Sequence, residues 1–225
     1  MLLALDTATQ RASIALHDGT TLRAECTWEA ASQHTVTLLP HIVQLLGNSG
    51  LSADDITAVA VCIGPGSYTG VRIGVSVAKG LASARKLPLV GITTLDVLAM
   101  AQLPDERPLY PIFAAGRKRV GFARYLYREG ASSPSGPIAT GWQAETGVQV
   151  TTWRQFADQL NLPAIVVGEI EPAGREALRP LFGRVEMPEP AWHLRRAGYL
   201  ADIAWRRLRA NQVDAPSALL PLYAR

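Results

Sequence analysis

The chain has 225 residues, of which 48% are apolar and 18% charged. A chain this apolar can offset the entropy of ordering its backbone, so the composition excludes wholesale disorder, and the length allows one large core or two smaller ones. The net charge of +3 is uneven: residues 1–112 carry 7 basic and 9 acidic side chains (net −2), and residues 113–225 carry 15 and 10 (net +5). A basic second half could face phosphate.

The first residues and the cysteines bear on the compartment. The chain opens with an apolar run, 2–5, that is followed at once by Asp6, so it lacks the basic start and long apolar region of a signal peptide. No apolar run approaches the roughly 20 residues of a membrane span. Cys26 and Cys62 have no C-x-x-C spacing, so we expect two buried thiols. We predict a cytoplasmic protein that does not bind membranes.

The first half alternates short apolar runs with turn signals. The pattern predicts strands at 2–6, 11–17, 20–28, 57–63 and 87–92, and helices at 33–48 and 69–85. The first three strands form a meander, and Thr93 and Thr94 can cap a short helix after the last strand. Hairpin strands followed by alternating helix and strand indicate an α/β lobe.

The pattern restarts after residues 103–105, so we predict one lobe at 1–106 and a smaller second lobe at 107–225. In the second lobe we expect strands at 109–115, 120–127 and 164–168, a helix capped by Thr152, a short helix around Arg175 and a long helix at 193–210. The stretch 129–136 is typical of a loop. The last helix could pack back on the first lobe.

A glycine-rich turn, 64–70, lies between a predicted buried strand and a helix. Free N–H groups and the helix dipole can hold an anion at such a place. It is not a Walker A loop, because Val71 and Arg72 follow Gly70 where Lys and Ser or Thr would be needed. Two interpretations stay open, a tight turn and an anion or nucleotide contact. The candidate contact residues are Asp6, Thr7, Gly64, Gly66 and Ser67.

Two helices of the first lobe have faces that suggest a partner. Small residues recur every four positions along helix 69–85, at Gly70, Gly74, Ala78 and Ala82. Helix 33–48 carries two apolar stripes, more than a one-sided surface helix needs: Leu38, Ile42 and Leu45, and Val36, Leu39, Val43 and Leu46. We predict a helix-pair interface with another chain, and burial within the lobe is the alternative. The candidate interface residues are His34, Leu38, Leu39, Ile42, Val71, Gly74, Val75 and Ala78.

Catalytic groups are scarce. His34 and His41 lie about 10 Å apart along one helix, too far to ligate one metal unaided, so we expect no bound metal. A phosphotransferase would need acidic ligands and a phosphate loop in the second lobe, but 113–117 has no carboxylate and 167–170 is not a flexible loop. We therefore expect no catalytic residues.

Basic residues cluster in and before the last predicted helix. They are Arg195, Arg196, Arg206, Arg207 and Arg209. Such charges most often form a solvated face, and contact with RNA phosphate is the alternative.

Three motifs together resemble one family. They are the opening Leu-Asp-Thr-Ala-Thr at 5–9, the segment around His34 and 38–42, and the block Gly-Pro-Gly-Ser-Tyr-Thr-Gly-Val-Arg-Ile-Gly at 64–74. With the final Leu-Tyr-Ala-Arg at 222–225, they resemble the bacterial TsaB (YeaZ) family. The resemblance implies a two-lobed actin-like ATPase fold of the ribonuclease H-like type with a reduced second lobe.

The resemblance also implies a role. It implies a non-catalytic scaffold subunit that pairs with TsaD for threonylcarbamoyl transfer to the adenosine beside the anticodon of tRNAs reading A-starting codons. TsaE, a second copy of the chain, and tRNA within the complex are the other implied partners. The chain alone would bind no cofactor, and any ATP or ADP would lie at the partner interface. The alternatives are an ATP-dependent phosphotransferase of the actin/hexokinase superfamily and a metallopeptidase. The family commonly has Asp-Ala-Arg where this chain has Ala115-Gly116-Arg117.

Overall fold

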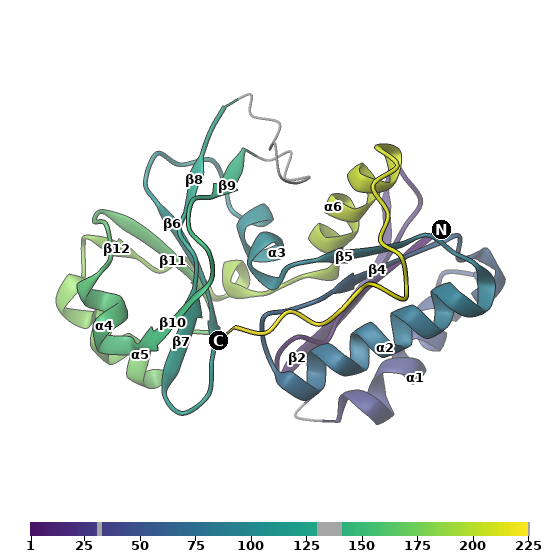
Figure 1. Cartoon of the computed structure of the whole chain (residues 1–225), viewed down its shortest axis with the longest axis horizontal. Coiled ribbons are helices and arrows are strands. Elements are labelled where there is room, and N and C mark those ends of the chain that lie inside the picture. Colours follow the sequence, from purple (N-terminus) through teal and green to yellow (C-terminus); the bar gives the residue numbers. More distant parts are fainter. Residues whose placement is uncertain (31–32, 130–140, 225) are drawn as a thin grey trace. The chain divides into compact units, whose positions relative to one another are not determined.

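Two mixed α/β units, each built on its own sheet, account for the residues that this computed structural model describes, 1–30, 33–129 and 141–224 (Figure 1). The first unit comprises Met1–Val97 and Arg195–Tyr223, and the second comprises Leu98–Leu194 together with Ala224. These bounds differ from the predicted division at residue 106. The C-terminal helix α6 (Ala197–Arg209) belongs to the first unit because it packs on the first two strands there, the position considered for the last helix from the sequence.

The first sheet has five strands in the order β3-β2-β1-β4-β5. The strands are β1 (Leu2–Asp6), β2 (Arg11–His17), β3 (Leu22–Glu29), β4 (Ala58–Cys62) and β5 (Leu89–Ile92). The first three form the predicted antiparallel meander, and β4 and β5 run parallel to β1. Every residue of β1, β4 and β5 is buried, as expected for parallel strands that helices cover on both faces.

Three helices cover this sheet. The helices α1 (His34–Asn48) and α2 (Tyr68–Arg85) lie on one face and α6 on the other (Figure 1). Ser67 caps α2 by accepting a hydrogen bond from the Gly70 N–H, and Lys86 ends the helix in a left-handed conformation. A short helix, α3 (Thr94–Met100), follows β5, and the Thr93 hydroxyl accepts from the Asp96 N–H as predicted for a cap.

The second sheet has seven strands, of which five follow the order β10-β7-β6-β11-β12, while β8 pairs with β6 and β9. They are β6 (Leu109–Ala114), β7 (Arg119–Phe122), β8 (Tyr125–Tyr127), β9 (Trp142–Ala144), β10 (Gln149–Thr152), β11 (Ala164–Gly168) and β12 (Val185–Glu186). The predicted strands at 109–115, 120–127 and 164–168 are confirmed, with 120–127 divided between β7 and β8. The predicted loop at 129–136 falls almost entirely outside the described residues.

Two helices cover the second sheet, α4 (Trp153–Asp158) and α5 (Pro172–Leu178). Thr152 caps α4 in a capping box with Gln155, as predicted. Aromatic rings of Phe122, Trp153 and Phe156 fill the core between helices and strands. The remaining short helices are of the 3-10 type, at Ala53–Asp55, Arg179–Leu181 and Pro190–His193.

The long helix predicted at 193–210 begins later than expected. Pro190–His193 forms a 3-10 turn, Leu194 and Arg196 are extended, and α6 starts only at Ala197. Among the residues with described positions, no helix is both long and apolar enough to cross a membrane.

Candidate functional site at the end of β1

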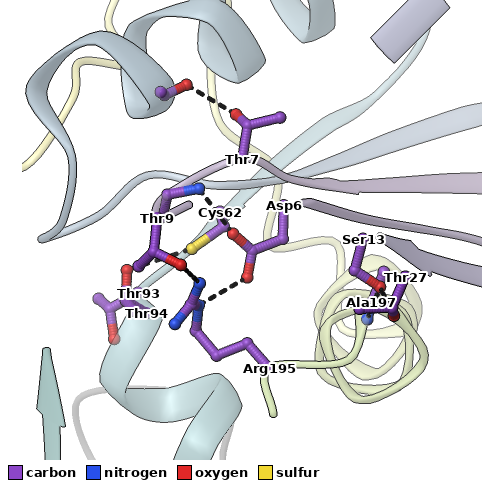
Figure 2. Close-up of polar contacts among 12 residues, drawn as sticks. Asp6, Thr7, Thr9, Ser13, Thr27, Cys62, Thr93, Thr94, Arg195 and Ala197 are labelled. Carbon is purple, nitrogen blue, oxygen red and sulfur yellow. Dashed lines mark hydrogen bonds and ion pairs between the residues drawn. The ribbon is translucent and has the colours of Figure 1, made fainter. Parts of the chain in front are cut away.

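A buried ion pair lies where β1 ends. Asp6 is the last residue of the strand, and only 1% of it is exposed. Its Oδ2 lies 3.1 Å from Nε of Arg195, and its Oδ1 accepts a 2.8 Å hydrogen bond from the Ala8 N–H (Figure 2). The Arg195 side chain is also buried, and its guanidinium donates to the Thr9 hydroxyl. The carboxylate is thus neutralised from within the same unit.

The start of α6 holds Arg195 in this position. The first N–H groups of a helix have no partner within the helix. Here the Ser13 hydroxyl accepts from the Ala197 N–H at 2.9 Å (Figure 2). A Glu25 carboxylate oxygen accepts from the Gly198 N–H at 2.8 Å. Side chains of β2 and β3 therefore anchor α6, and Arg195, two residues before the helix, reaches Asp6 at the end of β1.

His34 adds a second titratable group to this cluster. It begins α1 and is 3% exposed, and burial lowers the pKa of its imidazole, against a hydrogen bond with the Thr9 backbone and the charge of Asp6. Among the described residues, its Nδ1 has no hydrogen-bond partner. The structure thus places His34 near the end of β1, buried by the chain itself.

The glycine-rich turn packs directly onto the residues after β1. A side chain on Gly66 would collide with the Ala8 carbonyl, and the Ser67 N–H donates to that same carbonyl at 2.6 Å. Gly64 has a φ of +95°, which favours glycine. The structure therefore brings together all five predicted contact residues in one place. The backbone of the turn there lies in direct contact with the backbone that follows β1. Whether an anion binds there stays a prediction.

The small-residue stripe of α2 has a packing reason inside the chain. Side chains on Gly70 and Gly74 would collide with the backbone and the hydroxyl of Thr7, and that hydroxyl donates to the Gly70 carbonyl at 2.7 Å. Ala78 and Ala82 are buried on the same side of the helix. The stripe lets α2 lie against the end of β1, so close approach of a helix from another chain is not needed to explain it.

The predicted interface residues divide into two groups. Seven of the eight are buried by the chain itself, namely His34, Leu38, Ile42, Val71, Gly74, Val75 and Ala78. Leu39 is 52% exposed, and its neighbours on the same face of α1, Val36 and Val43, are 66% and 69% exposed. The second apolar stripe of α1 is therefore open along most of its length, whereas the other stripe is core. The intermolecular role of all eight residues stays a prediction.

The C-terminal arginines divide by exposure: Arg195 is buried and Arg207 half-buried, whereas Arg196, Arg206 and Arg209 are exposed, as the interpretation of a solvated face expects. Arg196 pairs with Glu25, with Nε 2.9 Å from Oε2. Arg207 donates to the Gly91 carbonyl at 2.8 Å and lies 3.3 Å from Asp214. Sequence analysis also missed the role of Arg195. One feature of the sequence points to such a partner for Asp6. This residue ends an otherwise apolar buried strand, and a buried carboxylate requires a cation or several N–H donors.

The cysteines are both free, and their environments differ. Cys62, at the end of β4, is fully buried as predicted, and its sulfur lies 3.3 Å from the Thr94 hydroxyl (Figure 2). Burial raises the pKa of this thiol to about 12, so it stays protonated at neutral pH and is a poor nucleophile. Cys26 is only half-buried, which corrects the prediction for that residue.

The corresponding strand of the second unit, β6, has no acidic residue of its own. At the end of β6, the Ala114 N–H donates to a carboxylate oxygen of Glu169 at 3.2 Å, and Glu169 directly follows β11. Gly168 has a φ of +118°, and a side chain there would collide with the Ile112 carbonyl. In the described part of the chain, no three or more His, Cys, Asp or Glu side chains gather as a metal site.

Comparisons with known proteins were made on sequence and on structure. The family model described as TsaD, tRNA N6-adenosine threonylcarbamoyltransferase, matches residues 28–134. The tRNA threonylcarbamoyladenosine biosynthesis protein TsaB of Haemophilus influenzae is 37% identical over 164 residues, 71% of this chain and 67% of the relative. The protein of that name from Buchnera aphidicola is 33% identical over 171 residues, 75% of this chain and 78% of the relative.

The fold has a counterpart among solved structures. YeaZ from Pseudomonas aeruginosa superposes with a TM-score of 0.75 at 22% identity, over 98% of this chain and 99% of that one. The likeness confirms the predicted α/β fold of the actin-like ATPase type.

Proposed function

Because the chain belongs to the TsaB family of tRNA threonylcarbamoyladenosine biosynthesis proteins, we propose that it is a non-catalytic scaffold subunit that pairs with TsaD. In this role it supports threonylcarbamoyl transfer to the adenosine beside the anticodon of tRNAs reading A-starting codons. The transfer itself takes place on TsaD, in the cytoplasm. TsaE and a second copy of the chain are further proposed partners.

The observation that carries the non-catalytic role is the buried ion pair of Asp6 with Arg195. Phosphoryl transfer on a fold of this type needs a carboxylate that can position a metal ion near phosphate. One oxygen of Asp6 accepts from the Ala8 N–H and the other faces the Arg195 guanidinium, which repels a divalent cation. The second unit offers no carboxylate on β6 to replace it, since that strand ends at Ala114. These features support the proposal that the chain has the fold of a phosphoryl-transfer enzyme but does not catalyse phosphoryl transfer.

The exposed stripe of α1 is the surface we propose for TsaD. Val36, Leu39 and Val43 follow one another at helical spacing and expose three branched apolar side chains in a row. Such a row exposed on a helix is typical of a protein contact, because covering it removes apolar surface from water. The contact uses the outer stripe of the helix, whereas Leu38 and Ile42 support it from the core.

Light scattering on the chain, on TsaD and on their mixture tests the scaffold role, followed by a threonylcarbamoylation assay of tRNA with and without the chain. We expect a one-to-one complex and modification that depends on both proteins. Absence of a complex together with modification by TsaD alone would contradict the proposal. ATP hydrolysis by the isolated chain that is lost on Asp6→Asn substitution would favour the phosphotransferase alternative.

Two charge substitutions on α1 test the surface. Leu39→Glu places a charge in the exposed stripe, and Gln44→Glu adds the same charge to another exposed position of the same helix. We expect Leu39→Glu to weaken TsaD association at least tenfold while Gln44→Glu leaves it within twofold, since a buried unpaired charge is costly and an exposed one is not. Equal association of both variants would place the TsaD contact elsewhere. Circular dichroism checks that both remain folded.

A further inference from the structure

The turn between β6 and β7 has an unusual backbone for its sequence. Residues Gly116–Arg119 close the hairpin, with the Arg119 N–H donating to the Gly116 carbonyl at 3.0 Å. The two central residues, Arg117 and Lys118, have φ values of +51° and +59°. A turn with two left-handed central residues is of type I′, and it strongly prefers Asn and Gly at these positions. Arginine and lysine occupy them here at a cost in stability.

These side chains form a cationic group at the surface, which we call the turn cations. Arg117, Lys118 and Arg119 are all exposed, and Arg154 lies near them because Arg119 pairs with Thr152 and α4 begins at the next residue. No ion pair involves any of the four among the described residues. Other arginines of the chain, by contrast, are paired: Arg195 with Asp6, Arg207 with Asp214 and Arg124 with Glu145.

We propose that the turn cations bind RNA phosphates. The inference rests on the proposed function, because it takes the RNA to be the tRNA that the complex modifies. Four cations without acidic partners fit a chain of phosphates by charge, and arginine can hold a phosphate by two parallel hydrogen bonds. Residues in sparsely populated backbone conformations persist where the surrounding structure or a function holds them. Asn and Gly would make this turn more stable than Arg117 and Lys118 do. A need for the two positive charges explains why the turn has Arg117 and Lys118.

A matched pair of glycine substitutions tests the proposal. Lys118→Gly removes one cation and relieves a left-handed lysine at the turn, and Lys86→Gly does the same at the end of α2, where Lys86 has a φ of +54° and is also exposed. Both variants lose one charge and gain the same conformational ease, so both should melt at a temperature equal to or above that of the unchanged chain. The double variant Arg117→Asn/Lys118→Gly adds the preferred type I′ sequence.

Fluorescence titration of an unmodified tRNA transcript, at several salt concentrations, measures binding by the chain alone and by its mixture with TsaD. We expect Lys118→Gly to weaken binding several-fold and to reduce the salt slope by about 1, and the double variant to reduce it by about 2, as one phosphate contact is lost per cation. Lys86→Gly should leave both quantities unchanged. Light scattering with TsaD separates this proposal from the scaffold role, because the turn variants should still form the complex.

Three outcomes would overturn the proposal. Equal weakening by Lys118→Gly and Lys86→Gly would show that only net charge matters. Unchanged affinity and slope in all variants, alone and with TsaD, would show that the turn cations do not touch RNA. Loss of the TsaD complex in the turn variants with tRNA binding unaltered would make the turn a contact for an acidic protein surface instead.

Discussion

The first strands of the two sheets, β1 and β6, differ in the polar contacts at their C-terminal ends. Both β1 and β6 pair with an antiparallel strand on one side and a parallel strand on the other. At the end of β1, Asp6 is buried and paired with Arg195. β6 itself ends in Ala114, and the carboxylate of Glu169 reaches back from the end of β11 to accept the Ala114 N–H. In the first unit a guanidinium neutralises a carboxylate of the strand itself, whereas in the second unit the carboxylate comes from the next strand and accepts a backbone N–H.

The difference shows that a residue type at a strand end does not by itself define a chemical role. A carboxylate at the end of β1 could position a metal ion if it were open to solvent, but the position of α6 decides that it instead receives a guanidinium. The anchored start of α6 therefore determines the surroundings of Asp6.

Four experiments break or sharpen this comparison.

Arg195→Met should destabilise the chain most. It removes the cation and leaves the Asp6 carboxylate buried without compensation, which costs about 3–5 kcal/mol in the free energy of unfolding. Urea denaturation followed by circular dichroism measures the change. The double variant Asp6→Asn/Arg195→Met should recover much of the loss, because the amide carries no charge. A double variant that is no more stable than Arg195→Met would show that the packing of the arginine stem, and not the ion pair, matters.

Gly70→Ala should have the next largest effect. Its methyl group would collide with the Thr7 carbonyl, so α2 must move away from β1, at a cost of about 1–3 kcal/mol as in other overpacked sites. Gly80→Ala in the same helix is the matched control, because nothing lies within 4 Å of the added carbon. It should stabilise the chain by about 0.5–1 kcal/mol. The two denaturation midpoints should move in opposite directions, and a shared direction would disprove the packing role of the stripe.

The pH dependence of stability compares the two units through one histidine in each, the buried His34 and the half-buried His193. Burial is the main cause that lowers the pKa of both His34 and His193. The unfolded chain therefore binds more protons than the folded one below about pH 6.5, the ordinary histidine value. Stability should be constant above that pH with respect to these groups and should fall as the pH drops, by at most about 1.4 kcal/mol per pH unit for each histidine.

The hydrogen bonds of the two histidines predict how they differ. In His193, Nδ1 accepts from the Gly168 N–H at 3.1 Å and the other nitrogen lies 2.7 Å from the Pro188 carbonyl, so protonation breaks the first bond. In His34, Nδ1 has no hydrogen-bond partner among the residues that the structure describes, so its protonation breaks no bond to them. Urea midpoints from pH 5 to 7.5 should flatten in both His34→Gln and His193→Gln relative to the unchanged chain. A dependence that persists in full in each variant would assign it to other groups.

Much of the fold follows from sequence patterns, and the reason lies in their periodicity. The runs that became β1, β2 and β4, and the helical periods of α1 and α2, are long and regular enough to be recognised within one or two residues. The strands β9, β10 and β12 are only three, four and two residues long and were not predicted. Strands so short depend on the neighbour they pair with, which local sequence does not reveal.

The site was harder to predict than the fold because its parts are distant in sequence. Asp6 and the glycine turn were singled out, but their neutralising partner lies 189 residues after Asp6, in a run of arginines typical of a solvated helix. The small residues of α2 were also recognised. Their spacing shows that something lies close to the helix, but not that this is Thr7 of the same chain. In both cases the sequence does not reveal which surface a residue meets, because that is a property of the tertiary structure.

Glu169→Gln should have the smallest effect and completes the comparison of the two strand ends. The amide oxygen of glutamine can accept the Ala114 N–H as the carboxylate does, and the half-buried position makes the loss of charge inexpensive. We expect a change of no more than about 1 kcal/mol in the free energy of unfolding, against several for Arg195→Met. If Glu169→Gln were as costly as Arg195→Met, the end of β6 would also depend on a charge, and the contrast between the two units would fail.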